Sequence, residues 1–118
     1  AVRVPVPSGS IADVTFVAKR ATSVEEVNEY LRKAATTKRW KRVFSVSDEP
    51  LVSSDILNTP YGSIADLTMT RVVGDLPAPG EARQAGGTLV KVLAWYDNEM
   101  GYVHTLIEHV LEVAKRIK

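Results

Sequence analysis

The 118-residue sequence contains no cysteine, and this absence excludes several kinds of chemistry at once. Thiolate catalysis, disulfide bonds and cysteine-based zinc sites all require that residue. A chain of this length removes roughly two thirds of its unfolded surface from water on folding, so its core does not depend on disulfides or a structural metal. We therefore expect a single domain over residues 1–118 with no metal site.

The sequence also lacks a strong net charge and a long apolar run. Its 15 Lys and Arg residues against 14 Asp and Glu residues give a formal net charge of +1, which supplies no general attraction to nucleic acid or an anionic membrane. No apolar run approaches the roughly 20 residues that span a bilayer, and the first residues do not resemble a signal peptide. We expect a soluble, cytoplasmic protein that binds neither nucleic acid nor membrane.

One basic segment stands out against this balanced charge, because residues 38–42 place four Lys or Arg residues around Trp40. A basic segment with an aromatic residue can stack on a nucleotide. The commoner structure for such a pattern is a short solvated loop whose tryptophan covers the edge of a core. We favour the loop, and keep phosphate or nucleotide binding through Arg3 and this segment as an alternative.

The spacing of apolar residues predicts a sheet. Extended structure is expected at residues 51–55, and the alternation or β-branched composition of strands is found in five further segments: residues 1–6, 11–19, 42–47, 64–73 and 88–96. The last of these is almost continuously apolar, which predicts a central strand buried on both faces.

Two further segments have the periodicity of helices. Ser23 is predicted to cap a helix of about three turns, with Val27 and Leu31 on its apolar face. The second helix is predicted over residues 98–118, with the apolar stripe Val103, Leu106, Ile107, Val110, Val113, Ala114 and Ile117. Because the strands are grouped rather than alternating with helices, we predict an α+β fold with a largely antiparallel sheet and two helices packed on one face.

Residues 74–87 separate the last two predicted strands and are rich in proline and glycine. This composition is typical of a flexible loop or linker. Its length is close to that at which loops without secondary structure become uncommon in compact domains. We interpret it as a flexible insertion rather than a functional flap.

The titratable residues do not predict a catalytic centre. His104 and His109 are five residues apart on the predicted last helix, which puts them on different faces and fits no shared metal site. Asp13, Asp66 and Asp97 stand beside strand residues, where capping and turn hydrogen bonds are the usual role. No glycine-rich turn between a strand and a helix is present to bind a dinucleotide. We assign no catalytic residue.

The most distinctive motif lies where the last strand is expected to meet the last helix: Trp95-Tyr96-Asp97-Asn98-Glu99-Met100-Gly101-Tyr102. Asp97 or Asn98 is expected to cap the helix. The motif also resembles the junction Trp-Tyr-Asp-Asn-Glu-(Trp or Met)-Gly-Tyr of phosphorylating glyceraldehyde-3-phosphate dehydrogenase. Three more segments resemble this family in the same order: Arg3-Val4-Pro5 with Asp13-Val14-Thr15, Pro50-Leu51-Val52-Ser53-Ser54-Asp55, and Ser63-Ile64-Ala65-Asp66.

The resemblance is to the C-terminal part of the family's catalytic domain and covers most of the chain apart from residues 74–87. It implies that Arg3 matches a position that helps to bind the substrate phosphate. Asn98 matches one that contacts the nicotinamide carboxamide of NAD, and Tyr102 lies nearby. The family's Cys nucleophile, its His general base and its NAD-binding domain have no counterpart here. The resemblance thus implies a glycolytic oxidoreductase fragment that is inactive and binds no cofactor by itself.

Two roles remain open for such a chain. As a truncated or redesigned fragment, it is expected to have no activity alone and to need a complementary dehydrogenase chain. As a stand-alone structural or binding module, it is expected to form a homo-oligomer. Removal of half of a domain leaves an apolar sheet face, which a second copy can cover.

Overall fold

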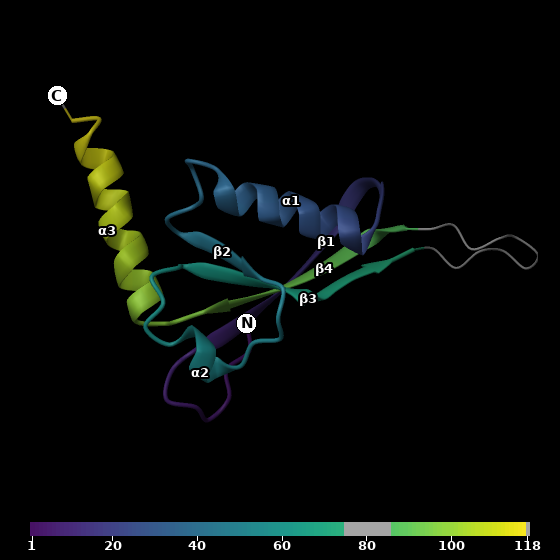
Figure 1. Cartoon of the computed structure of the whole chain (residues 1–118), viewed down its shortest axis with the longest axis horizontal. Helices are drawn as coiled ribbons and strands as arrows, with labels where there is room; N and C mark the ends of the chain where they lie inside the picture. Colours follow the sequence, from purple (N-terminus) through teal and green to yellow (C-terminus); the bar gives the residue numbers. More distant parts are fainter. Residues whose placement is uncertain (75–85, 118) are drawn as a thin grey trace, which may run out of the picture.

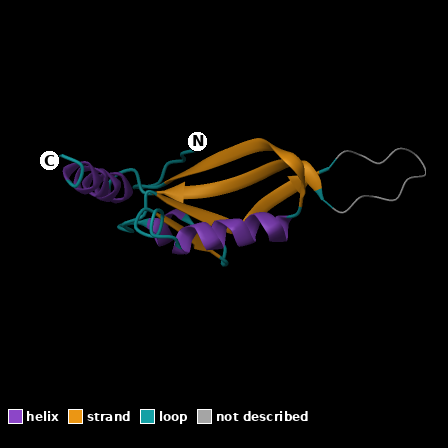
Figure 2. Ribbon diagram, turned by 90° about the horizontal axis from the view of Figure 1, so that it is seen from above, coloured by secondary structure: helices purple, strands orange, loops and turns teal. Residues whose placement is uncertain are grey.

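The computed structural model describes residues 1–74 and 86–117, which form a mixed sheet with helices beside it (Figure 1 and Figure 2). The elements in chain order are β1 (Ser10–Thr22), α1 (Val24–Thr36), β2 (Phe44–Ser47), α2 (Ser53–Ile56), β3 (Ser63–Val73), β4 (Gly87–Tyr96) and α3 (Met100–Ala114). The four strands lie in the order β1-β4-β3-β2. β4 pairs antiparallel with both neighbours, and β2 pairs parallel with β3. This confirms the α+β class and the mostly antiparallel sheet.

Helix α1 lies on one face of the sheet, against β2 and β3. Ser23 caps it as predicted, because the Ser23 hydroxyl oxygen accepts the backbone N–H of Glu26 at 3.2 Å. Val27 and Leu31 then point into the core, where apolar burial supplies most of the stability of a short helix. The buried centre of this core consists of Ala65, Leu67, Val90 and Val92.

Strand β3 contains an irregularity between Asp66 and Arg71, where its register against β4 shifts. The fully buried Asp66 carboxylate accepts the backbone N–H of Thr68 at 3.1 Å and its hydroxyl at 2.6 Å. Asn28 of α1 donates its side-chain N–H to the Leu67 carbonyl at 3.0 Å. These bonds satisfy backbone groups that the bulge takes out of the ladder. Asp66 is a turn-forming carboxylate, as predicted.

The prediction of a strand over residues 1–6 is wrong. Only Val2 pairs with the sheet, through an isolated antiparallel bridge to Ile11. Pro5 and Pro7 have no backbone N–H, so the pairing cannot continue along the segment.

The expectation of extended structure at residues 51–55 is also wrong, since α2 begins at Ser53. The Asp55 carboxylate accepts the backbone N–H of Val52 at 2.8 Å and closes a helical turn. A single carboxylate three residues along the chain is enough to bend such a short segment.

Strand β4 is central, as predicted, but it is not buried on both faces. Val90 and Val92 face the core and are buried, whereas Leu89 is 42% exposed. Lys91 forms an ion pair with Asp13 of β1, at 2.7 Å between Nζ and Oδ2. Figure 2 shows α1 on one face only. The apolar composition of β4 indicates a sheet interior but does not show how much of each face is covered.

Helix α3 extends away from the sheet (Figure 1), which differs from the expected packing of two helices on one face. It is held near its beginning, where a Cβ added to Gly101 would come within 2.5 Å of the Tyr61 carbonyl oxygen. Arg42 also pairs with Glu108 at 2.8 Å. The apolar stripe forms as predicted from Val103 to Ala114 but is largely exposed, and Ile117 lies beyond the end of the helix, which spans Met100–Ala114 rather than residues 98–118. Periodicity predicts an apolar face without specifying what covers it.

The predicted flexible insertion at residues 74–87 lies mostly outside the described residues. On its two sides β3 and β4 remain paired, with Val73 opposite Leu89. The flanking Gly86 has a φ of 104°, a conformation in which glycine is strongly favoured.

Candidate functional site

Asp97 lies at the junction between β4 and α3 and organises it. Its side chain is buried, at 4% exposure, and Oδ1 accepts the backbone N–H groups of Glu99 and Met100 at 2.8 and 3.2 Å. Oδ2 accepts the N–H of Asn58 at 2.9 Å, and the Ser8 hydroxyl donates to Oδ1 at 3.3 Å. Asp97 therefore organises the start of α3 and ties two distant segments to it. The N-cap residue of α3 is Glu99, however, so the prediction that Asp97 or Asn98 caps the helix is wrong.

The electrostatic environment of Asp97 favours its ionised form. Burial raises the pKa of this carboxyl, but hydrogen bonds from the backbone N–H groups of Glu99, Asn58 and Met100 outweigh burial and hold the pKa below its ordinary value. Asn58 donates from the left-handed conformation, with a φ of 61°, which asparagine adopts more readily than most residues. The junction thus contains a buried, permanently charged structural carboxylate at neutral pH.

Arg3 and Asn98, two of the three predicted site residues, are in direct contact. Arg3 Nη1 donates to Asn98 Oδ1 at 2.5 Å, and Nη2 donates to the Pro7 carbonyl at 3.2 Å. The Ser10 hydroxyl donates to the same Asn98 oxygen at 3.0 Å. Because both bonds use the amide oxygen, the amide N–H groups of this exposed side chain are available to a ligand carbonyl.

The segment that carries Arg3 is held against the junction by Gly9 and Ile56. Gly9 has a φ of 99°, and a Cβ added to it would come within 3.1 Å of Ile56 Cδ1. Ile56, at the end of α2, is fully buried. Residue 9 must therefore be small and must adopt a conformation that glycine allows.

Tyr102, the third predicted site residue, lies in the first turn of α3 and is 65% exposed. Among the described residues, no hydrogen bond joins it to Arg3 or Asn98. Ser10, by contrast, was not predicted although it contacts Asn98. Its position depends on the pairing of β1 with β4, in which Ser10 lies opposite Tyr96, and no local pattern signals that.

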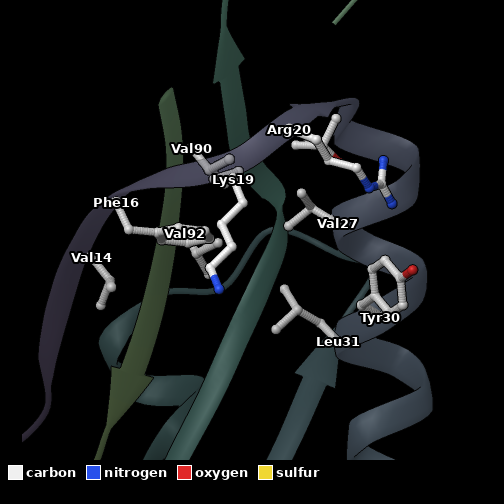
Figure 3. Close-up of a pocket in the computed structure, with 11 residues that line it drawn as sticks. Val14, Phe16, Lys19, Arg20, Val27, Tyr30, Leu31, Val90 and Val92 are labelled. Carbon is white, nitrogen blue, oxygen red and sulfur yellow. The ribbon is translucent and has the colours of Figure 1, made fainter. Parts of the chain in front are cut away.

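A separate apolar groove of about 530 Å³ lies between β1 and α1 (Figure 3). Figure 3 shows Phe16 on the sheet side, with Val27 and Leu31 opposite it on α1. Phe16 remains 45% exposed. Most of the groove's surface is apolar, although Lys19, Arg20 and Thr22 also line it, so it is suited to packing rather than to acid or base chemistry.

Neither a metal site nor a membrane helix is found within residues 1–74 and 86–117. No group of three or more His, Cys, Asp or Glu side chains there is arranged to hold a metal ion. No helix in that part of the chain combines the length and the apolar character needed to cross a bilayer.

Comparison with known proteins identifies close relatives. The family model for the C-terminal domain of glyceraldehyde 3-phosphate dehydrogenase matches residues 1–98. Glyceraldehyde-3-phosphate dehydrogenase 1 of Streptomyces avermitilis is 42% identical over 113 residues, which is 96% of this chain and 30% of the relative. The glyceraldehyde-3-phosphate dehydrogenase of Thermotoga maritima is 44% identical over 100 residues, which is 85% of this chain and 26% of the relative.

The match is thus nearly complete for this chain and partial for its relatives, of whose length it spans about 30%. The motifs at Arg3, Asp55 and Asp66 lie within the residues matched by the family model, as do the first four residues of the junction motif, Trp95 to Asn98. The chain belongs to the glyceraldehyde-3-phosphate dehydrogenase family, as a portion of its C-terminal domain.

Proposed function

We propose that this chain provides the C-terminal part of the catalytic domain of an NAD-dependent, phosphorylating glyceraldehyde-3-phosphate dehydrogenase, a glycolytic enzyme of the cytoplasm. The observation that carries the proposal is the hydrogen bond between Arg3 and Asn98, which joins residues 95 positions apart at 2.5 Å. These are the residues that the resemblance assigns to substrate phosphate and to cofactor. Their contact supports a shared binding site.

Arg3 is suited to bind the substrate phosphate. Its guanidinium has five N–H donors in a planar fork, a geometry that matches phosphate oxygens. Hydrogen bonds to Asn98 and to the Pro7 carbonyl orient the group, while the side chain stays exposed and retains further donors. Its position is therefore fixed before a ligand binds.

Asn98 fits the carboxamide of a nicotinamide ring. The Ser10 hydroxyl, on a residue only 4% exposed, and Arg3 hold the Asn98 oxygen, so the amide N–H groups are presented to a carbonyl. Tyr102 offers a second polar contact from the first turn of α3. NAD bound by a complete enzyme would supply the hydride acceptor, and this chain would contribute to its orientation.

The 118-residue chain is expected to have no dehydrogenase activity by itself. The acyl-transfer step of the family needs a thiolate nucleophile, and the chain has no cysteine. In the proposed enzyme, the nucleophile, the general base and the NAD-binding domain are supplied by residues other than these 118.

A chimera tests this proposal. Replacing the matching part of the Streptomyces avermitilis enzyme with this chain should give an enzyme that produces NADH from glyceraldehyde-3-phosphate, whereas this chain alone should not. In the chimera, Arg3→Gln should raise KM for glyceraldehyde-3-phosphate roughly 10- to 100-fold, because it removes a charge-assisted bond to phosphate.

The matched control is Arg32→Gln, which removes an exposed arginine paired with Asp48 on the surface. It should leave KM unchanged. A folded chimera that binds NAD but produces no NADH would contradict the proposal, and so would turnover by the 118-residue chain alone.

Self-association is a second candidate function, supported by a different observation. Helix α3 exposes large apolar side chains along its length, in addition to the open groove beside α1. Exposed apolar surface of this kind marks interaction sites. A homo-oligomer is the state in which a second copy covers it.

A further inference from the structure

The basic segment at residues 38–42 borders an apolar pocket that the proposed dehydrogenase function does not use. The pocket has a volume of about 410 Å³, within the range of roughly 300–1,000 Å³ typical of small-molecule sites. Its lining comes from α1, the basic segment, β2, the turn before β3, and α3: Ala34, Trp40, Val43, Phe44, Gly62, Ser63 and Thr105.

The pocket lies where the basic segment, the turn before β3 and the first half of α3 meet α1 and β2. Gly62 allows the turn before β3 to pack closely against α3, because a Cβ at this residue would collide with Thr105 Oγ1. The ion pair of Arg42 with Glu108 ties the basic segment to α3 at 2.8 Å, and the Glu108 side chain is only 12% exposed. This partly buried ion pair holds α3 beside the basic segment.

The charges around the pocket are unbalanced. On α3, Glu108 pairs with Arg42 and Glu112 pairs with Lys115. Within residues 1–74 and 86–117, no ion pair involves Lys38, Arg39 or Lys41, all of which are exposed. Lys115 and, to a smaller extent, Lys38 lower the pKa of the Glu112 carboxyl on α3, so the excess of positive charge beside the pocket comes from Arg39 and Lys41.

Arg39 and Trp40 connect this charge to the pocket wall. The Arg39 guanidinium carbon lies 4.9 Å from the centroid of the Trp40 ring, a cation–π distance. Trp40 remains 43% exposed although it lines the pocket. An apolar group that covers Trp40 would thus lie next to a cation.

We propose that this pocket binds a small organic anion, with its aromatic or aliphatic body against Trp40 and Phe44 and its carboxylate or phosphate beside Arg39. The pocket supplies apolar surface for the body, and the unpaired cations supply complementarity for the head group. Inorganic phosphate lacks the body, and a neutral aromatic molecule lacks the charge. The binding is independent of the contact between Arg3 and Asn98.

Dansylglycine and dansylamide form a suitable pair of probes, because they share a fluorescent ring and only dansylglycine carries a carboxylate. Titrated into the 118-residue chain, dansylglycine should bind about three- to tenfold more tightly than dansylamide. Arg39→Gln should abolish that difference. Ala34→Leu, which adds volume to the lining, should weaken both probes.

Two control variants separate this pocket from the groove in Figure 3. Phe16→Ala and Lys19→Gln alter the lining of that groove and should leave dansylglycine affinity unchanged. The proposal fails if the two probes bind equally well. It also fails if Phe16→Ala weakens dansylglycine while Ala34→Leu, shown to be folded by circular dichroism, does not.

Discussion

Replacing Asp97 with asparagine should lower the free energy of unfolding by about 3 kcal/mol. The buried carboxylate accepts three backbone N–H groups, and it joins the start of α3 to Asn58. An asparagine keeps one oxygen but turns an N–H₂ group toward donors that need an acceptor. Urea denaturation followed by circular dichroism measures the loss.

The control for this substitution is Asp48→Asn, which removes an exposed carboxylate that pairs with Arg32. Surface ion pairs contribute roughly 0–1 kcal/mol, so this variant should be close to wild type. Equal effects of the two substitutions would show that the junction does not depend on the Asp97 carboxylate.

The same carboxylate should make stability depend on pH in the acid range. Because the pKa of Asp97 is lower in the folded state, its contribution is fully present above the unfolded pKa of about 3.9 and is lost as the pH falls through the folded pKa. The difference in unfolding free energy between wild type and Asp97→Asn should therefore shrink below about pH 4. A difference that stays constant down to the acid limit would contradict the role assigned to ionised Asp97.

Replacing Ile56 with alanine should cost about 2–5 kcal/mol of stability, the range for a large-to-small change in a core. Ile56 is fully buried, and it lies against Gly9 in the segment that carries Arg3. The cavity should also loosen that segment. We expect lower protection of the Ile11 amide, which donates to the Val2 carbonyl, in hydrogen exchange.

Val52→Ala is the matched control, because Val52 directly precedes α2 and is 58% exposed. Such a surface change is usually within about 0.5 kcal/mol of wild type. If Ile56→Ala loses less than about 1 kcal/mol, the segment is anchored by other contacts.

Local sequence signals were sufficient where the determinants lie within a few residues. The Ser23 cap depends on an amide three positions away and was predicted correctly, whereas the N-cap of α3 is Glu99 rather than Asp97 or Asn98. The prediction of a strand over residues 1–6 was wrong because the valines there compete with Pro5 within the segment and Pro7 directly after it. The prediction that α3 packs on the sheet was wrong because its apolar stripe does not specify which surface it packs against.

The candidate site depended on more than local signals. Arg3 and Asn98 were found through the family resemblance, since no spacing rule connects residues 95 positions apart. No sequence motif indicated Ser10, because it reaches Asn98 only through the pairing of β1 with β4. The pocket at Trp40 likewise depends on the packing of segments that are far apart in the sequence. The sequence indicated only the basic segment next to it.

Sedimentation velocity of the pure chain, over a wide range of concentration, tests whether its exposed apolar surface belongs to a larger assembly. Wild-type chain should associate into a discrete dimer or tetramer. Val110→Gln, on the exposed stripe of α3, should shift it toward monomer, whereas Glu112→Gln should not. A chain that stays strictly monomeric at high concentration, with α3 still helical, would show that this surface needs no further cover.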